Sequence, residues 1–131
     1  MIWEKIMGDN KVEFKNILEC PEYWDDLLIW RNSDFVRLNM YNQHIITKEE
    51  HFNWLESLKT EEVQKTRQHF IAFIDGVAVG STNIYDINKE KKSLYWGVFL
   101  KSEQERGIGF NVLQNFELFL STQGFNILYC E

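Results

Sequence analysis

The feature that most constrains the fold is an apolar stretch that runs through a glycine turn into a helix pattern. Residues 94–100 read Leu-Tyr-Trp-Gly-Val-Phe-Leu, the turn contains Gly107 and Gly109, and residues 107–123 carry apolar side chains at helical spacing. This succession predicts a strand, a turn and a helix. Residues 125–130 then predict a last strand, which is parallel to the strand 94–100 if the helix between them forms a right-handed crossover.

The N-terminal half predicts a further strand and several helices. Val12 and Phe14 alternate with polar residues, as in a strand, and residues 21–32 have helical spacing after Pro21, which suits the first turn of a helix. Residues 33–40 predict a short second helix or a turn. Residues 47–50 form a capping box, Thr-Lys-Glu-Glu, that starts another helix.

The apolar face of that capped helix is predicted to consist of Phe52, Trp54, Leu55 and Leu58, and the polar residues 60–68 predict a loop. Asp75-Gly76 is typical of tight hairpins, so residues 69–74 and 77–85 predict two antiparallel strands, with a bulge at Gly80. In the strand 94–100, Trp96, Val98 and Leu100 are expected on one face and the intervening residues on the other.

The final helix is expected to bury a stripe of four residues and to end at a glycine cap. The stripe consists of Phe110, Leu113, Phe116 and Leu120, and Gly124 is the predicted cap. The element order is therefore strand, two helices, a three-strand meander, a helix and a parallel strand. It predicts an α+β fold in which an antiparallel meander and one parallel strand pair form a mixed sheet with flanking helices.

Composition narrows the class of protein. The 131 residues suit one domain, residues 1–131, with a core that needs no disulfides. A net charge of −6 argues against a general nucleic-acid binder. Cys20 and Cys130 lack CxxC spacing, so neither a disulfide framework nor a metal site is expected. No apolar run reaches membrane-spanning length, and we expect a soluble, cytoplasmic protein.

The glycine turn resembles a known family signature. Residues 104–109, Gln-Glu-Arg-Gly-Ile-Gly, match the Q/R-x-x-G-x-G/A pattern of the GNAT superfamily of N-acetyltransferases, and they lie between a predicted strand and a predicted helix. Upstream, residues 30–32 (Trp-Arg-Asn), 40–42 (Met-Tyr-Asn) and 49–55 (Glu-Glu-His-Phe-Asn-Trp-Leu) resemble the GNAT branch that acetylates UDP-linked amino sugars, in particular in the pseudaminic acid pathway. The resemblance covers roughly residues 12 to 130.

The resemblance implies acetyl-CoA as cofactor and direct transfer of the acetyl group to the amine of a small-molecule nucleotide sugar. The cofactor-binding residues that it implies are Val98, Phe99, Leu100, Gln104, Arg106, Gly107, Ile108, Gly109, Phe110 and Asn111. Tyr95 stands where many members carry a catalytic Glu, so Tyr95 and His51 are the catalytic candidates. The implied substrate-binding residues are Arg31, Asn32, Met40, Tyr41, His51, Trp54, Ser81 and Thr82.

Several of these residues also have a purely structural interpretation. The Gly107–Gly109 turn can be a simple strand-to-helix corner, and Trp54 can be a core residue rather than a stacking group. Arg31 and Asn32 can be a solvated helix end, favoured by the helix dipole. His51, Ser81 and Thr82 can be packing residues of a helix and a strand.

The family also implies a further segment after residue 131, with a helix whose Tyr protonates the CoA thiolate and a final strand pair that this chain lacks. We therefore expect a domain that is incomplete at its C-terminus, in which unpaired strand edges favour a homodimer. Two other functions stay open: acetylation of a protein N-terminus or other small amine, and binding of CoA without catalysis. No nucleic acid or membrane partner is expected.

Overall fold

The computed structural model describes residues 11–40, 42–102 and 107–130, and it contains a five-stranded sheet of order β1-β2-β3-β4-β5. The strands are β1 (Val12–Asn16), β2 (Gln68–Ile74), β3 (Val77–Asn88), β4 (Ser93–Leu100) and β5 (Ile127–Cys130). Neighbours from β1 to β4 are antiparallel, and β4 and β5 are parallel. The predicted α+β mixed sheet is therefore confirmed.

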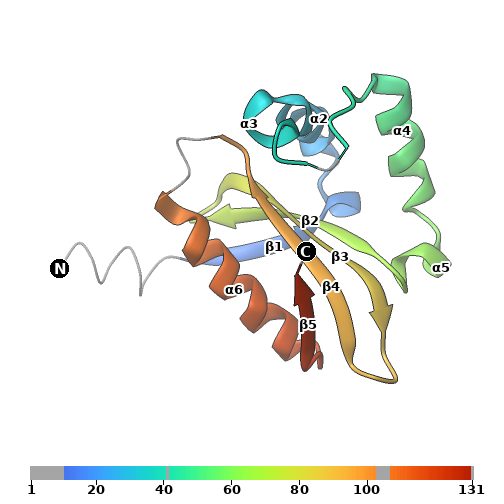
Figure 1. The fold of residues 1–131 in the computed structure, drawn as a ribbon, viewed down its shortest axis with the longest axis vertical. Coiled ribbons are helices and arrows are strands. Elements are labelled where there is room, and N and C mark those ends of the chain that lie inside the picture. The colour runs from blue at the N-terminus through green and yellow to red at the C-terminus, as the bar shows by residue number, and fades with distance from the viewer. Residues whose placement is uncertain (1–10, 41, 103–106, 131) are drawn as a thin grey trace.

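Helices cover both faces of this sheet (Figure 1). The helix α6 (Gly109–Thr122) lies on one face, while α2 (Trp24–Asn32) and α4 (Lys48–Ser57) pack on the other. The short helices are α3 (Asp34–Arg37) and α5 (Glu61–Gln64), and the 3-10 turns are η1 (Ile17–Glu19) and η2 (Pro21–Tyr23). Within the described residues, no helix combines the length and apolarity that a bilayer crossing needs.

Strand alternation divides the core into two layers. Ile71 and Phe73 of β2 point toward α2 and α4, where they pack with Leu27 and Leu55. Their neighbour Phe70 points the other way and packs with residues of α6. Trp96, Val98 and Leu100 of β4 also pack on the α6 side, whereas Phe99 packs on the α2 side, so the predicted facing of this strand is confirmed.

Several boundaries differ from the prediction. The polar segment 60–68 is not only loop, because Thr60 caps the short helix α5 through its side chain. Pro21 starts a 3-10 turn, and the α-helix begins only at Trp24. The capping box of α4 forms as predicted, with Thr47 accepting from the Glu50 N–H and Glu50 accepting in return.

Two apolar residues do not lie on the faces predicted for them. Phe52 of α4 is exposed, and Phe110 of α6 is 65% exposed. The other three predicted residues of the α6 stripe do pack on the core: Phe116 and Leu120 are buried and Leu113 is partly buried, while Val112 takes the place of Phe110. The reason is the direction of the side chain, because Phe110 lies about 200° around the helix from the buried Val112.

The predicted bulge exists, but it is centred one residue before Gly80. Ala72 pairs with Gly80 and Phe73 pairs with Ala78, which leaves Val79 as the extra residue. Gly80 itself matters for the next strand, because a β-carbon there would lie 2.3 Å from the Phe99 carbonyl oxygen. The glycine therefore permits a close approach of β3 to β4.

Candidate functional site

The sheet opens beside the C-terminal half of β4. Pairing with β5 runs from Ser93–Ile127 to Trp96–Cys130, and among the described residues β4 continues beyond it without a partner on that side. Figure 1 shows β5 stopping beside the middle of β4 while β4 runs on. We call residues 97–100 the open edge of β4. Its backbone N–H and C=O groups that point away from β3 are available to a ligand.

The N-terminus of α6 lies in the chain just after the open edge. Its N-cap residue is Ile108, and no described side chain caps the first turn. The first N–H groups of a helix have no intrahelical partners and favour an anion. Asn111 adds a second donor, because its side chain is only 6% exposed and its Nδ2 has no hydrogen-bond partner within the described ranges. Its Oδ1 accepts from Asn115 Nδ2 at 2.8 Å, which leaves only the N–H₂ group unused.

The predicted cofactor residues are therefore brought together at one place. Val98, Phe99 and Leu100 form most of the open edge, and Gly107 to Asn111 form the turn and the helix start. A β-carbon on Gly107 would meet no described atom within 4 Å, so the turn has room at this point. Gln104 and Arg106, which the signature also includes, lie outside the described residues.

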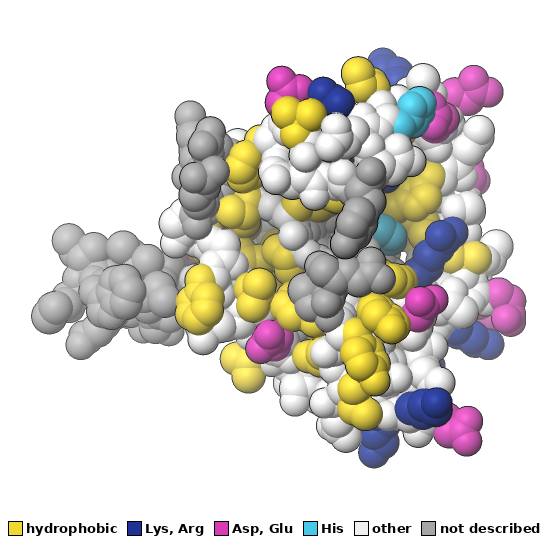
Figure 2. All heavy atoms as spheres, viewed as in Figure 1, with side chains coloured by type: hydrophobic (Ala, Val, Ile, Leu, Met, Phe, Trp, Pro, Cys, Tyr) yellow, Lys and Arg dark blue, Asp and Glu magenta, His cyan; other side chains and the backbone are white. Residues whose placement is uncertain are grey.

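A stack of three tyrosines crosses the sheet next to the open edge, on the α2 and α4 side. Tyr95 lies between Tyr85 and Tyr129, at ring-centroid distances of 5.5 and 4.9 Å. Figure 2 shows hydrophobic side chains gathered over the region of β4 and β5, where Ile127 and Tyr129 are exposed. The predicted catalytic Tyr95 is thus held in place by aromatic neighbours, two residues before Gly97 on the same face of β4.

A pocket of about 570 Å³ lies on the same face, between α4, α5 and the strands β2 and β3. It is lined by Trp54, Val63, Thr66, Arg67, His69, Asn83, Tyr85 and Asp86. Trp54 contacts His69 edge to face at 4.6 Å, and the Arg31 guanidinium lies over the Trp54 ring, 4.6 Å from its centroid. Two predicted substrate residues, Arg31 and Trp54, therefore belong to one cluster.

Sequence reasoning assigned no role to His69, because its spacing fits no metal site. Burial lowers the pKa of His69 to about 3, with the charges of Arg31 and Arg67 as smaller causes in the same direction. The ring is therefore neutral at physiological pH. Burial also lowers the pKa of Arg31. The one signal in the sequence was strand alternation, which places His69 and Ile71 on the same face of β2.

His51 is placed by the structure inside the protein and not in this pocket. Its side chain is 1% exposed, and Nε2 donates to the Trp24 carbonyl oxygen at 2.7 Å. Burial lowers its pKa. A side chain so enclosed cannot touch a substrate in this conformation, so the catalytic and substrate-binding prediction for His51 is corrected to a structural one. Its stacking on Trp54, at 5.7 Å, makes it a support for the pocket wall.

Three further predicted substrate residues have structural positions: Asn32 and Ser81 are hydrogen-bonded within the fold, and Thr82 is buried. Asn32 uses both ends of its amide on the backbone of Ile46, each at 2.8 Å, and so ties α2 to the segment before α4. Ser81 is buried and donates to the Phe70 carbonyl oxygen at 2.9 Å. Thr82 is buried on the opposite, α6-facing side of β3. Because neighbouring strand residues point to opposite faces, Ser81 and Thr82 cannot share one acceptor pocket.

Met40 and Tyr41 are the two remaining predicted substrate residues. Met40 is exposed in the turn after α3. Tyr41 lies outside the described residues.

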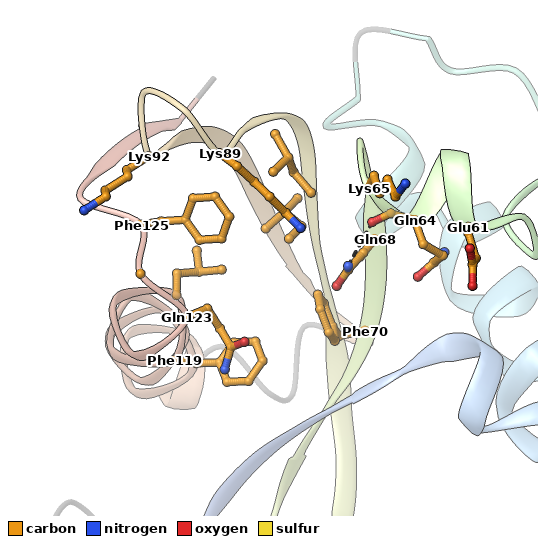
Figure 3. Close-up of a pocket in the computed structure, with 14 residues that line it drawn as sticks. Glu61, Gln64, Lys65, Gln68, Phe70, Lys89, Lys92, Phe119, Gln123 and Phe125 are labelled. Atoms are coloured by element: carbon orange, nitrogen blue, oxygen red, sulfur yellow. Dashed lines mark hydrogen bonds between the residues drawn. The ribbon is translucent and has the colours of Figure 1, made fainter.

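A larger cavity of about 790 Å³ lies on the α6 side of the sheet (Figure 3). Phe70, Phe119 and Phe125 form its apolar wall, and Lys89 and Lys92 lie at its rim. It is located at the C-terminal end of α6, whereas the open turn is at the N-terminal end. Of the residues predicted for cofactor or substrate, none that the structure describes lines this cavity.

Comparisons with known proteins agree with this geometry at the level of the fold. No family model and no curated protein matches the sequence. Among solved structures, a domain from Methanocaldococcus jannaschii is similar with a TM-score of 0.69 and 17% identity, over 93% of this chain and 77% of that chain. Campylobacter jejuni N-acetyltransferase PseH in complex with acetyl coenzyme A has a TM-score of 0.64 and 20% identity, over 92% and 75%.

A third similar structure is apo FdhC, described as a nucleotide-linked sugar GNAT, with a TM-score of 0.59 and 22% identity, over 88% of this chain and 65% of that chain. These likenesses show the fold: the chain has the GNAT fold of N-acetyltransferases. The open edge of β4 and the start of α6 are the parts of that fold on which we base the function proposed below.

Proposed function

We propose that the protein is an acetyl-CoA-dependent N-acetyltransferase whose acceptor is the amine of a nucleotide-linked amino sugar. The observation that carries this proposal is the open edge of β4, followed in sequence by the N-terminus of α6, whose first turn no described side chain caps. An unpaired strand edge binds amide groups by strand-like hydrogen bonds, and a helix N-terminus binds phosphate. Acetyl-CoA has both groups, in its pantetheine arm and its pyrophosphate.

The residues present fit acetyl-CoA. The open edge supplies backbone groups for the pantetheine amides, and Gly107 leaves room for a phosphate beside the backbone. Asn111 brings a buried N–H₂ group that has no partner within the described residues. A bound anion would satisfy that donor, and an unsatisfied buried donor otherwise costs roughly 1–3 kcal/mol. Acetyl-CoA bound there would supply the acetyl group.

The chain's own groups can assist the transfer in two ways. A backbone N–H of the open edge can donate to a carbonyl oxygen that becomes more negative during the reaction. Tyr95, held between Tyr85 and Tyr129, can orient the acceptor or a water through its hydroxyl. An ordinary tyrosine is a poor base near neutral pH, so we assign Tyr95 an orienting role and not proton removal.

The acceptor class is supported by similarity and by the pocket beside the open edge. Residues 30–32, 40–42 and 49–55 resemble enzymes that acetylate UDP-linked amino sugars, and two of the similar structures are the N-acetyltransferase PseH and the nucleotide-linked sugar GNAT FdhC. The finer proposal is the enzyme of the pseudaminic acid pathway, UDP-4-amino-4,6-dideoxy-N-acetyl-β-L-altrosamine N-acetyltransferase. The pocket of about 570 Å³ lies on the face of the sheet where Tyr95 points.

Two measurements test the proposal. Isothermal titration calorimetry with acetyl-CoA should give one site with micromolar affinity. A thiol-release assay should then show CoA formation with UDP-4-amino sugars and not with peptides that carry a free N-terminus. Absence of heat up to high micromolar acetyl-CoA would contradict the cofactor proposal, and turnover of the peptides alone would replace the sugar with a protein N-terminus as acceptor.

A further inference from the structure

We infer that the pocket formed by α4, α5, β2 and β3 is the acceptor site, and that it selects amines carried on a phosphate-type anion. In this inference Arg67 and Arg31 hold the anion, while His69 and Asn83 receive the amine next to the open edge of β4. The inference rests on the proposed acetyl transfer, and it adds three residues, Arg67, His69 and Asn83, that the sequence motifs did not indicate.

The first argument is the position of a polar row on the sheet. His69 of β2 pairs with Asn83 of β3, and Asn83 pairs with Gly97 of β4. Residues paired in this way have their side chains on the same face. Gly97 directly follows Trp96, where the pairing of β4 with β5 ends. The row therefore leads from the pocket to the point at which the sheet opens.

The second argument is that position 97 is a glycine, which leaves space for the Asn83 side chain. A β-carbon on Gly97 would lie 2.8 Å from Asn83 Oδ1, so the Asn83 amide occupies the space above the glycine. Any larger residue at position 97 would displace that amide. The glycine thus lets Asn83 reach the open edge, where a reacting amine has to meet the donor held by β4.

The third argument is charge. Among the described residues, neither Arg31 nor Arg67 forms an ion pair with a carboxylate, although the chain carries 20 acidic residues and only 14 basic ones. Arg67 lines the pocket and Arg31 lies over Trp54, which also lines it. One guanidinium group in the lining and a second one over the Trp54 ring favour an anionic ligand, and Arg is suited to phosphate through its forked donors.

The fourth argument concerns the amine end. His69 lines the pocket and stays uncharged, so it can accept a hydrogen bond from an amine without repelling it. The groups that face it are Arg31 and Arg67, the Trp54 ring and, on the same wall, Asp86. A pocket with both Asp86 and Arg67 in its lining is complementary to a ligand that carries both an amine and an anion.

The anion end is tested by titrating uridine diphosphate into the full chain, with and without saturating CoA. We expect one UDP site that persists when CoA fills the α6 site. Arg67→Gln and Arg31→Gln should each weaken UDP binding by about 10-fold or more, the loss of a charge-assisted hydrogen bond. Arg37→Gln is the matched control, since Arg37 pairs with Asp34 on α3, outside the pocket, and it should leave UDP affinity within about twofold.

The amine end is tested by NMR of the histidine rings, which is simple because the chain has three histidines. His69→Gln assigns the His69 signal. A UDP-4-amino sugar should shift that signal further than UDP alone does, because UDP acts on His69 only through the charges of Arg31 and Arg67. Equal shifts from the two ligands would contradict contact between His69 and the amine. The inference is overturned if UDP affinity is equal in both pocket arginine variants and the unaltered chain, or if the amino sugar leaves the His69 signal in place. CoA binding is unaffected in either case, so a failure of the pocket and a failure of the cofactor proposal are distinguishable.

Discussion

The backbone contact at Gly80 shows how one residue can set the distance between two strands. With a β-carbon 2.3 Å from the Phe99 carbonyl oxygen, Gly80→Ala forces β3 and β4 apart. We expect a loss of about 2–4 kcal/mol in the free energy of unfolding, typical of overpacking against rigid backbone. Urea denaturation measures it. Gly107→Ala is the control, since its β-carbon meets no described atom within 4 Å, and it should change stability by less than about 0.5 kcal/mol.

His69 makes stability depend on pH in a predictable direction. Its pKa falls from 6.5 to about 3 in the folded protein, so below pH 6.5 the unfolded chain binds a proton that the folded one does not. The contribution of His69 to the free energy of unfolding is therefore complete above pH 6.5. It falls by about 1.4 kcal/mol per pH unit as the pH decreases toward 3. Denaturant titrations from about pH 6 to about pH 4 should show that His69→Gln removes a slope of this size. Equal slopes in both proteins would show that His69 is charged in the fold.

The start of α6 provides the clearest prediction at the level of an element. Asn111→Asp keeps the oxygen that accepts from Asn115 but replaces the N–H₂ group, which has no partner among the described residues, with a negative charge. Repulsion of a phosphate should weaken acetyl-CoA binding at least about 10-fold. The favourable position of an acid near a helix N-terminus offsets part of the cost of burying the new charge.

Calorimetry with acetyl-CoA measures this change, and thermal unfolding without ligand confirms that the variant folds. Asn115→Ala serves as the comparison, because it removes the partner of Asn111 Oδ1 and leaves the N–H₂ group in place. If Asn111→Asp binds as tightly as the unaltered chain, the anion does not lie at this helix terminus.

At the scale of the whole molecule, α6 covers one face of the sheet and completes the core layer on that face. Phe116 is fully buried and contacts Phe14 of β1, Phe70 of β2 and Trp96 of β4, at ring-centroid distances of 5.0, 6.0 and 5.8 Å. Phe116→Ala should therefore destabilise the fold by about 3–5 kcal/mol. Leu118→Ala, on the exposed side of the same helix, should cost less than about 1 kcal/mol in the same urea titration. A small effect at Phe116 would mean that α6 is not required for the sheet to form.

The sequence alone was sufficient to predict the strands of the meander, the helix that connects β4 to β5, and the glycine turn. These features follow from short-range patterns: alternation in a strand, apolar spacing in a helix and a glycine where the chain turns. Prediction failed at Phe52 and Phe110, because both have helical spacing but lie where no sheet residue covers them. Helical period defines a stripe, and only the docked position of the helix decides which residues of it are buried.

The candidate site also has one part that local sequence can indicate and one part that depends on strand pairing. The turn at Gly107 and the open edge of β4 are close in sequence, so a motif could indicate both. His69, Asn83 and Gly97 come from three strands, and nothing in the local sequence connects them; the register of β2, β3 and β4 brings them into one row.

His51 and Asn32 are the opposite case, since a motif indicated them but the structure does not leave them available to a ligand. Both matched a pattern, but the fold encloses His51 and uses both ends of the Asn32 amide. The sequence by itself determined the elements and the glycine turn, because these depend on neighbours along the chain. Only the tertiary structure decided which polar groups stay free to meet a ligand, because that depends on strand pairing and on burial between layers.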